Sequence, residues 1–529
     1  IAATVGWTGR YENMNNIRVS TNGGLVTENW FDLNASRYTP SSTLQRMELL
    51  KTGYMGTLSL GWDNYLFLEL TGRQERSSTL KDQSFFYPSA NLSFLFTQAF
   101  HMPSWWNYGK LRLSYGIVGN APETYTANIV YEQGSDNGFT WNTIPSSWGN
   151  ADIHPEKKYE YEIGLESKFL NNRLGIDISY YNNRVKDQIL STPQPSTSGV
   201  KNVLMNVGEV ANRGWDISIS ATPILTRDFR WDLTANYGVY KNKVVKLADG
   251  VPYLEILNSG GSGIKIQAVE GQPMGDIYAQ VPQVNENGEY LVSDKGLYLN
   301  QTELQKVGNI NPAGVGGLFN SFSYKNVFLD FSIDFRIGGD VINEMNQYAT
   351  AVGLTPESLK YRDTEHGGLS YYYPGDNNSS GIPVQVDPST GAGPNGEIIY
   401  HDGIILPGVV ASTGERNTRI IPAGYYYNTT YNWGTEAEQL TYRHSVFDNS
   451  YVKLRELTIG YQFPEKMISK LGLGRLSVSV FGRNLFYFYK ALKNYDAESS
   501  VGTSWANQAT VGSSTTATRS FGVSLRASF

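Results

Sequence analysis

Apolar and polar residues alternate one by one along many stretches of this chain. The stretch "RLGIDISYY" (173–181) places Leu, Ile and Tyr on one face and Arg, Gly, Asp and Ser on the other. The stretches "FRWDLTANYGV" (229–239) and "NVFLDFSIDFRI" (326–337) repeat this pattern. A period of two predicts β-strands with one apolar and one polar face.

The pattern predicts an all-β chain of about fourteen strands. The expected ranges are 1–12, 49–61, 65–76, 87–99, 108–119, 157–168, 173–184, 207–220, 229–242, 315–325, 326–338, 449–462, 475–487 and 518–529. Only "PESLKYR" (356–362) and "PEKMISKLG" (464–472) have a short helical pattern.

The connections between these strands alternate in length. Tight turns are expected at 62–64, 170–172, 226–228 and 325–326, and long loops at 13–48, 120–156, 185–206, 243–314, 339–448 and 488–517. Tilted strands of about 9–11 residues with short turns on one side and long loops on the other are typical of transmembrane antiparallel β-barrels. Structureless loops of this length are rare in compact soluble domains.

The chain ends on a strand, "RSFGVSLRASF" (519–529). Its apolar side is formed by Phe521, Val523, Leu525 and Phe529. An open sheet edge in lipid leaves backbone groups without partners, so the last strand of a barrel must pair with the first. We therefore expect these four residues at the closure of a barrel.

Composition agrees with a membrane barrel. The 529 residues include 40% hydrophobic, 13% aromatic and only 17% charged residues, with a net charge of −6. This charge does not indicate a nucleic-acid partner. No apolar run reaches the length of about 18 residues that a membrane helix needs. Cysteine is absent, which excludes disulfides and thiolate sites. The first residues follow a strand pattern and not that of a signal peptide, so we expect that residue 1 is not the biological start of the protein.

Several stretches resemble the SusC/RagA-like TonB-dependent outer-membrane transporters of Bacteroidetes. The most specific is "NSYVKLRELTIGYQFPEKMISKLGLGRLSVSVFGRNLFYF" (449–488), followed by "KNYDAES" (493–499). Other similar stretches are "LRLSYGIVGN" (111–120), "YEYEIGLESKFLNNRLGIDISYYNNRVKDQI" (159–189), "NVGEVANRGWDISIS" (206–220), "NPAGVGGLFNSFSYKNVFLDFSI" (311–333) and "DGIILPGV" (402–409). They occur in order and span most of the chain.

The resemblance implies a 22-stranded barrel filled by an N-terminal plug domain. The present chain would then supply the C-terminal part of the barrel from about the ninth strand, with the plug and its TonB-contacting segment outside it. It also implies TonB-driven import across the outer membrane and a SusD-like surface lipoprotein as a lid. The expected cargo is an oligosaccharide, with an oligopeptide second. A passive porin-like channel and a soluble glycan-binding β-protein remain alternatives.

No catalytic constellation is evident, and we do not expect an enzyme. The histidines, His101, His154, His366, His401 and His444, lack metal-ligand spacing. Glu160, Glu162 and Glu166 share one strand face, which suggests acid–base chemistry or, more simply, the wall of a wet lumen. The Gly-rich "SGGSG" (259–263) lacks the following helix or lysine of a phosphate cradle.

One loop has a spacing similar to that of a calcium-binding loop. In "DNNSSGIPVQVD" (376–387), oxygen-bearing side chains at Asp376, Asn378, Ser380 and Asp387 occupy positions one, three, five and twelve of an EF-hand-like pattern. Flanking helices are absent and position twelve is Asp rather than Glu. Structural Ca²⁺ is therefore an expectation, with a solvated polar loop as its alternative, and no other cofactor is expected.

Aromatic residues in the long loops are the best candidates for contacts with a substrate or a lid. Flat rings next to Asn, Asp and Ser suit sugars, peptides and protein interfaces alike. The candidates are Trp141, Trp148, Tyr371, Tyr372, Tyr373, Tyr425, Tyr426, Tyr427 and Trp433. Aromatic residues near strand ends are instead expected in the interfacial girdles of the barrel: Tyr180, Trp215, Trp231 and Phe488.

Overall fold

The computed structural model describes residues 1–529 except 82–83, 137–138, 260–262, 376–380, 433–440, 501, 503, 513–516 and 529. The chain divides into two compact units. Unit 1 comprises 1–217 and 241–252, and unit 2 comprises 218–240 and 253–529. Each unit contributes strands to the main sheet and carries smaller elements of its own.

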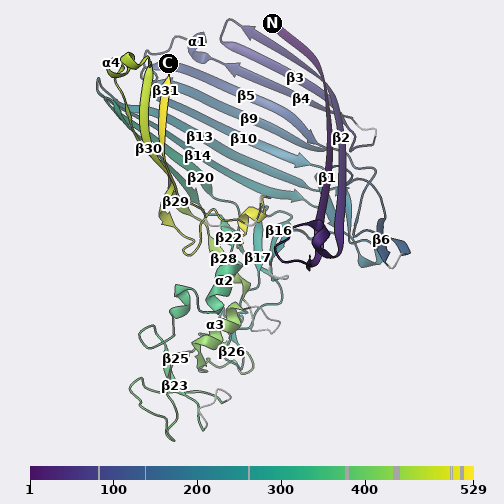
Figure 1. Ribbon diagram of the computed structural model, residues 1–529, viewed down its shortest axis with the longest axis vertical. Helices are drawn as coiled ribbons and strands as arrows, with labels where there is room; N and C mark the ends of the chain where they lie inside the picture. The colour runs from purple at the N-terminus through teal and green to yellow at the C-terminus, as the bar shows by residue number, and fades with distance from the viewer. Residues whose placement is uncertain are drawn as a thin grey trace. The chain divides into compact units, whose positions relative to one another are not determined.

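The main sheet has fourteen strands, as the alternation predicts (Figure 1). Each strand neighbours the next one of the set, so the order along the sheet is the order along the chain. The strands are β1 (Ala2–Leu25), β2 (Ser36–Trp62), β3 (Leu66–Ser77), β4 (Ser84–Phe94), β5 (Trp106–Asn120), β9 (Glu156–Phe169), β10 (Leu174–Lys186), β13 (Glu209–Leu225), β14 (Phe229–Lys246), β20 (Gly314–Tyr324), β21 (Val327–Ile337), β29 (Tyr451–Gln462), β30 (Arg475–Lys490) and β31 (Ser520–Ser528).

Tight turns join the strands where the sequence predicts them. Between β2 and β3, Asp63 and Asn64 have φ angles of 53° and 59°. Asp and Asn tolerate this left-handed conformation, whose twist matches that of the flanking strands in a hairpin. Lys325 (φ 51°) occupies the corresponding turn between β20 and β21.

The predicted loop 13–48 is wrong over most of its length. β1 and β2 continue as a two-stranded ribbon, and their register is unbroken from Ala2 opposite Ser59 to Ser20 opposite Ser41. Backbone pairing therefore persists where the apolar alternation lapses in "NMNNIRVSTNGG". Only residues 26–35, which include the 3₁₀-helix η1 (Leu33–Ala35), connect the two strands.

The short helices also depart from expectation. The two predicted helical stretches form η4 (Pro356–Leu359) and α4 (Glu465–Ile468) followed by η6 (Ser469–Leu471). Among the described residues, the sequence pattern also missed η1 (Leu33–Ala35), α1 (Phe96–Ala99), η2 (Ser196–Ser198), α2 (Glu344–Ala351), α3 (Ala423–Tyr431), η5 (Tyr442–Ser445) and η7 (Asn507–Ala509). Within the described ranges, none of the helices has the length and apolar character needed to cross a membrane.

The long loops are folded and contain small sheets. The strands are β6 (Glu132–Asp136) with β7 (Phe139–Thr143); β8 (Ser147–Trp148) with β11 (Ile189–Pro193) and β12 (Asn202–Asn206); β15 (Tyr253–Ser259), β16 (Ile264–Val269), β17 (Asp276–Ala279) and β19 (Gln305–Asn309); β18 (Leu291–Val292) with β26 (Val409–Val410); β22 (Asp340–Ile342) with β28 (Val446–Asp448); and β23 (Leu369–Tyr372), β24 (Val384–Gln385), β25 (Tyr400–Ile404) and β27 (Ile421–Pro422).

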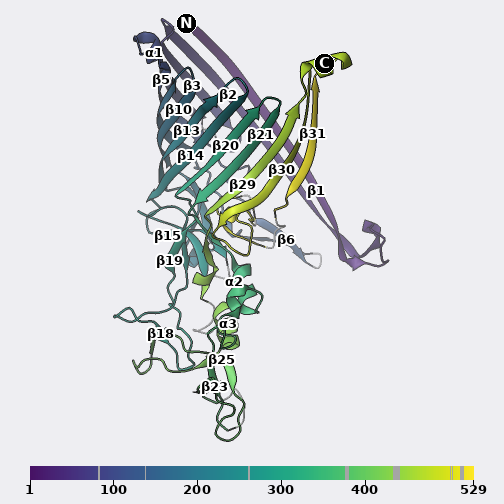
Figure 2. The ribbon, with the colours of Figure 1, turned by 90° about the vertical axis from the view of Figure 1, so that its left-hand side faces the viewer.

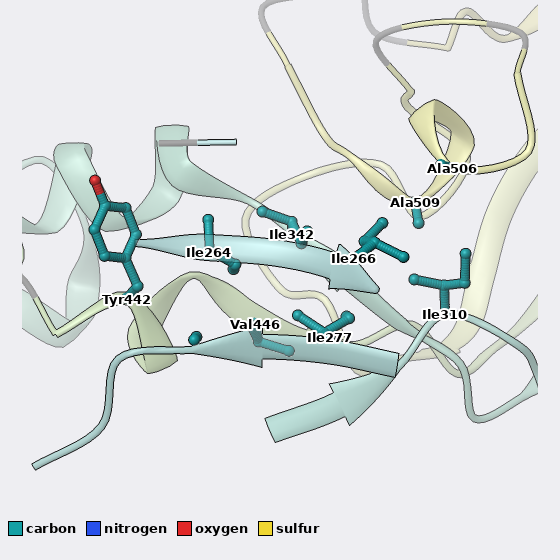
Figure 3. Packing of buried hydrophobic residues seen from close by; sticks show 10 residues of the cluster. Ile264, Ile266, Ile277, Ile310, Ile342, Tyr442, Val446, Ala506 and Ala509 are labelled. Atoms are coloured by element: carbon teal, nitrogen blue, oxygen red, sulfur yellow. The ribbon is translucent and has the colours of Figure 1, made fainter. Parts of the chain in front are cut away.

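Three long loops of unit 2 share one hydrophobic core (Figure 3). Ile266 on β16 and Ile277 on β17 pack with Ile342 on β22 and with Ala506 and Ala509 near η7. Ile266, Ile277 and Ile342 are fully buried. Burial of such side chains contributes about 1.5–3 kcal/mol each, which explains why these segments fold instead of remaining structureless.

Within unit 2, the folded loops lie at one end of the sheet strands. In both Figure 1 and Figure 2, α2, α3, β23 and β25 lie beyond the ends of β29 and β30 that are far from the C-terminus. α4 lies at the opposite end, beside the last residues of β31. This agrees with the predicted separation of long loops from short turns.

The main sheet has an apolar face and a polar face, set by strand register. In unit 1, Leu113 stands opposite Ile163 and Ile163 opposite Tyr180, whereas Arg112 and Ser179 lie on the other face beside Gly164. Leu113 and Ile163 are 38% and 47% exposed. Large apolar side chains without a protein core against them are those of a lipid-facing surface.

The predicted closure residues lie on the last strand. Phe521, Val523 and Leu525 stand opposite Gly482, Val480 and Val478 of β30, on the apolar face, and all three are exposed. Phe529 lies outside the described residues. Among the described strands β31 has one sheet neighbour, β30, so pairing of its other edge stays a prediction.

Candidate functional site

Charged residues of unit 1 form a bridge across three strands of the polar face. Arg112 on β5 reaches over Gly164 on β9 and binds Asp177 on β10 at 2.7 and 3.1 Å, and Ser179 at 3.2 Å. A Cβ at Gly164 would lie 2.8 Å from the guanidinium, so a larger residue there would displace the arginine from this position. Glu166 lies 3.6 Å from the same guanidinium.

The three predicted glutamates belong to this polar face. Glu160 pairs with Lys158 at 2.6 Å and accepts a hydrogen bond from Asn183 at 3.0 Å, while Glu166 pairs with Arg112. Carboxylates held by neighbouring cations form a charged wall. This arrangement differs from two carboxylates that flank one substrate bond.

Unit 2 has a hollow of about 550 Å³ on its own polar face. Ser321 donates to Asp330 at 2.6 Å, and Arg483 pairs with Glu456 at 3.2 Å near it. The lining residues are Phe319, Ser321, Phe328, Asp330, Glu456, Thr458, Gln462, Arg475, Ser477, Ser479, Arg526, Ala527 and Ser528. Hydroxyls, charges of both signs and two aromatic rings can bind a polar solute by hydrogen bonds and stacking.

A second charge cluster fastens a long loop to β29. Arg455 donates to both carboxylate oxygens of Glu498, at 2.8 and 2.6 Å, and pairs with Asp334 of β21 at 2.5 Å. Lys453, which is 1% exposed, donates to Glu498 at 2.6 Å. A bidentate arginine–carboxylate pair is among the stronger hydrogen-bonded contacts.

The pKa of Glu498 reflects this setting. Burial alone would raise the pKa, but the hydrogen bonds from Arg455 and Lys453 lower it to about 2. The same loop is held by Tyr487, which donates to Asp496 at 2.9 Å. The β30–β31 loop therefore lies against the sheet as a fixed element of the polar face.

The tyrosines predicted at 371–373 lie in a folded loop. Tyr371 and Tyr373 are 2% and 4% exposed and pack with Tyr400, and the Tyr371 hydroxyl donates to Asp402 at 3.0 Å. Tyr372 is half-buried. Tyr371 and Tyr373 thus form the interior of the loop. Substrate or lid contact by the three residues stays a prediction.

The tyrosines at 425–427 lie on α3. Tyr425 is 41% exposed, Tyr426 is half-buried, and Tyr427 is buried and donates to the carbonyl of Glu357 at 2.8 Å. Tyr425 is therefore the ring of this group most open to a ligand. Trp433 lies outside the described residues.

A stacked tyrosine–histidine pair joins α3 to η5. The ring of Tyr431 stacks on His444, with centroids 4.4 Å apart. Burial, with a smaller effect of Arg443, lowers the pKa of His444 to about 4. The imidazole is thus neutral at physiological pH.

Trp141 and Trp148 lie in two different small sheets of unit 1. Trp141 on β7 is 45% exposed and its ring covers Gly134 of β6. Trp148 on β8 is half-buried and contacts Tyr131 edge-on, at a centroid distance of 6.0 Å. Both stay candidate contacts.

The girdle candidates lie on sheet strands. Tyr180 contacts Trp215 at 4.9 Å between ring centroids, and Trp231 stacks on Phe322 at 5.5 Å. Phe488 is 57% exposed.

Comparison with known proteins identifies the family. The family described as "TonB dependent receptor-like, beta-barrel" matches residues 3–283, more than half of the chain. The chain belongs to this family. It is 24% identical over 494 residues to TonB-dependent receptor P3 of Formosa agariphila, covering 85% of this chain and 42% of that protein. It is 30% identical over 247 residues to the TonB-dependent receptor SusC of Bacteroides thetaiotaomicron, covering 43% of this chain and 24% of that protein.

Among solved structures, the RagAB peptide transporter has the same fold. The TM-score is 0.67 at 18% identity, over 94% of this chain and 50% of the solved chain. The chain thus spans half or less of the length of these relatives. The TonB-dependent receptor-like barrel is an outer-membrane fold, which confirms the predicted localisation.

The calcium prediction for this TonB-dependent receptor-like barrel is untested. Asp376, Asn378 and Ser380 lie outside the described residues, and Asp387 accepts a hydrogen bond from the backbone N–H of Ser389 at 2.9 Å. Within the described part of the chain, no group of three or more His, Asp or Glu side chains is arranged to hold a metal ion.

The sequence reading missed the Arg455 cluster of this receptor-like barrel. Lys453 and Arg455 alternate in "KLREL", which is a signal for two cations on the polar face of one strand. Their partner Glu498 lies 43 residues from Arg455. Sequence alone does not show that the loop folds back onto β29.

Proposed function

We propose that this chain forms part of the wall of an outer-membrane importer for a large polar nutrient. The observation that carries the proposal is the polar face of a sheet whose other face is apolar. Bridges such as Arg112–Asp177 hold charged groups in place on that polar face. A solute that passes along it meets hydrogen-bonding groups in place of lipid.

In this proposal TonB supplies the energy. By resemblance to the SusC/RagA-like transporters, TonB contacts a plug segment that is outside this chain and displaces it with energy from the proton gradient. The chain itself breaks no bond. Its strands and loops contain, bind and guide the cargo.

A SusD-like surface lipoprotein is the proposed lid. Support comes from one side of α2, where Met345, Tyr348 and the C-cap residue Val352 recur at helical spacing and are 39%, 41% and 46% exposed. Leu354, just beyond the helix, is 78% exposed. Adjacent exposed apolar side chains mark protein–protein contact sites.

The proposed cargo is an oligosaccharide, with an oligopeptide as the second candidate. Exposed aromatic rings such as Trp141 and Tyr425 suit the flat faces of sugars. The peptide candidate is favoured by the shared fold with the RagAB peptide transporter. Both classes are large and polar, so the same wall suits either.

Uptake by cells tests the proposal. The complete transporter would be expressed in a strain that lacks it, and uptake of labelled oligosaccharides and labelled oligopeptides would be followed with and without a protonophore. Uptake of one class that stops with the protonophore and in a TonB-deficient strain is expected. Uptake that is insensitive to both would indicate the passive porin-like channel, and no gain in uptake of either class would refute the importer.

A further inference from the structure

A hollow of about 250 Å³ lies against three strands of unit 1. The residues around it come from β5, β9 and β10, and they are Tyr115, Tyr159, Glu160, Tyr161, Asn182, Arg184 and Lys186; of these, Glu160 directs its carboxylate to Lys158 on the polar face. Strand register places Tyr115 opposite Tyr161 and Tyr161 opposite Asn182. Since Tyr161 is two residues from Ile163, all three lie on the apolar, lipid-facing side of the sheet.

The hollow lies at the end of the apolar face that is next to the long loops. On β10 the apolar face carries Leu174, Ile176, Ile178 and Tyr180 before it becomes polar at Asn182. The thirteen residues of β10, from Leu174 to Lys186, span about 40 Å along the strand, or about 30 Å across a membrane at a tilt of about 40°. Lys186 therefore lies at the level of lipid headgroups, on the side where the long loops of outer-membrane barrels face the exterior.

Cations surround the hollow. Lys157 stands opposite Lys186 in the register of β9 and β10. Arg184 pairs with Glu209 at 3.0 Å. Within the described part of the chain, no carboxylate lies within ion-pair distance of Lys157 or Lys186.

β13 adds a further cation. Asn212 bonds to Asn183 at 2.9 Å and Trp215 contacts Tyr180, so Arg213 lies beside Asn182 on the apolar face. Arg213 is exposed and, among the described residues, it too has no carboxylate at ion-pair distance. On the apolar face the site thus combines four cations with the paired carboxylate of Glu209, while the carboxylate of the lining residue Glu160 is paired with Lys158.

We infer that this hollow binds the phosphate-bearing headgroup of a glycolipid in the outer leaflet. Lys157, Lys186 and Arg213 supply uncompensated positive charge for phosphate, because arginine and lysine are the side chains that bind it. The rings of Tyr115 and Tyr161 supply a flat floor for the sugar and the first carbons of the acyl chains. The inference is independent of the cargo proposed above.

Lipid binding to the complete transporter tests this inference. The purified protein in detergent would be titrated with a diphosphorylated glycolipid, and bound lipid would be counted by native mass spectrometry. The variant K157Q/K186Q/R213Q is expected to bind about a hundredfold more weakly, because each Lys or Arg near anionic lipid contributes about fivefold. Wild type is expected to bind the dephosphorylated glycolipid much more weakly than the diphosphorylated one.

The matched control is Lys158→Gln, which removes a cation from the adjacent residue on the polar face. It should bind the glycolipid as wild type does, and retained heat-modifiable gel migration would show that both variants are folded. Equal binding by wild type and the triple variant, or equal binding of both glycolipids, overturns the inference. Binding of inorganic pyrophosphate at this site without binding of the glycolipid also overturns it, since the anion would then be a free phosphate.

Discussion

Arg455 and Glu498 face each other through two charge-assisted hydrogen bonds, of 2.8 and 2.6 Å, although 43 residues separate them in the chain. One belongs to strand β29 and the other to the loop before β31. The pair therefore fixes the position of the β30–β31 loop relative to β29.

Replacing Arg455 with Gln should loosen this loop. Glu498 would keep Lys453 as a partner but lose both guanidinium bonds, at a cost of about 1–3 kcal/mol. The expected result is a lower unfolding temperature and faster cleavage by trypsin after Lys493. Limited proteolysis of the purified transporter measures this.

Arg475→Gln is the control for Arg455→Gln. Arg475 is the first residue of β30, at the end far from the loop that contains Glu498, and it donates a hydrogen bond to Gln462 at 3.1 Å. Its variant should be cleaved at the wild-type rate. Equal rates for Arg455→Gln and wild type would show that the ion pair does not hold the loop.

Stability should also depend on pH through His444. The folded-state pKa of about 4 lies below the value of about 6.5 in an unfolded chain, so between these values the unfolded state binds a proton that the folded state excludes. Excluding this proton contributes to the free energy of unfolding in full above pH 6.5. As the pH falls to 4 the contribution is lost, which lowers the free energy of unfolding by about 1–3 kcal/mol. Thermal unfolding followed from pH 7.5 to 4.5 should show the decline.

The variant His444→Phe should flatten this part of the pH profile. A phenyl ring preserves stacking on Tyr431 but has no proton to gain. If wild type and variant lose stability in parallel between pH 6.5 and 4.5, other groups cause the decline.

The strands were predictable from sequence because every second side chain of a membrane-spanning strand faces lipid and is therefore apolar. The alternation at Leu174–Tyr180 and the turn at Asp63–Asn64 are local signals, and both elements form where expected. The ribbon beyond residue 12 was missed because backbone pairing in β1 and β2 does not require apolar alternation.

The candidate site was harder to predict because its contacts join distant segments. Tyr371 and Tyr425 both occur in "YYY" runs, yet Tyr371 is 2% exposed and Tyr425 is 41% exposed. The neighbouring residues in the two runs do not show that the Tyr371 ring packs against Tyr400 of β25 while the Tyr425 ring lies on the surface of α3. Arg455 and Glu498 likewise become a pair only through the path of the loop.

Tyr371→Ala should unfold the loop that contains it. The substitution removes a buried ring that stacks on Tyr400 and a hydroxyl that donates to Asp402, and loss of a buried aromatic side chain costs about 3–5 kcal/mol. Hydrogen exchange over β23 and β25 should become faster. Tyr425→Ala is the comparison, since its exposed ring can be removed without a cavity. If cargo contacts Tyr425, this variant should reduce uptake while exchange stays as in wild type.

The two faces of β21 should respond differently to charge. Ile333 stands opposite Leu318 on the apolar face, whereas Ser332 stands opposite Glu456 on the polar face. Ile333→Arg should cost about 2–4 kcal/mol, because the guanidinium would have to enter lipid near the membrane centre. Ser332→Arg places the same group in a wet, acidic setting and should be tolerated. The amount of heat-modifiable protein in outer membranes reports both outcomes. Equal assembly of the two variants would mean that the face assigned to lipid by strand register is wrong.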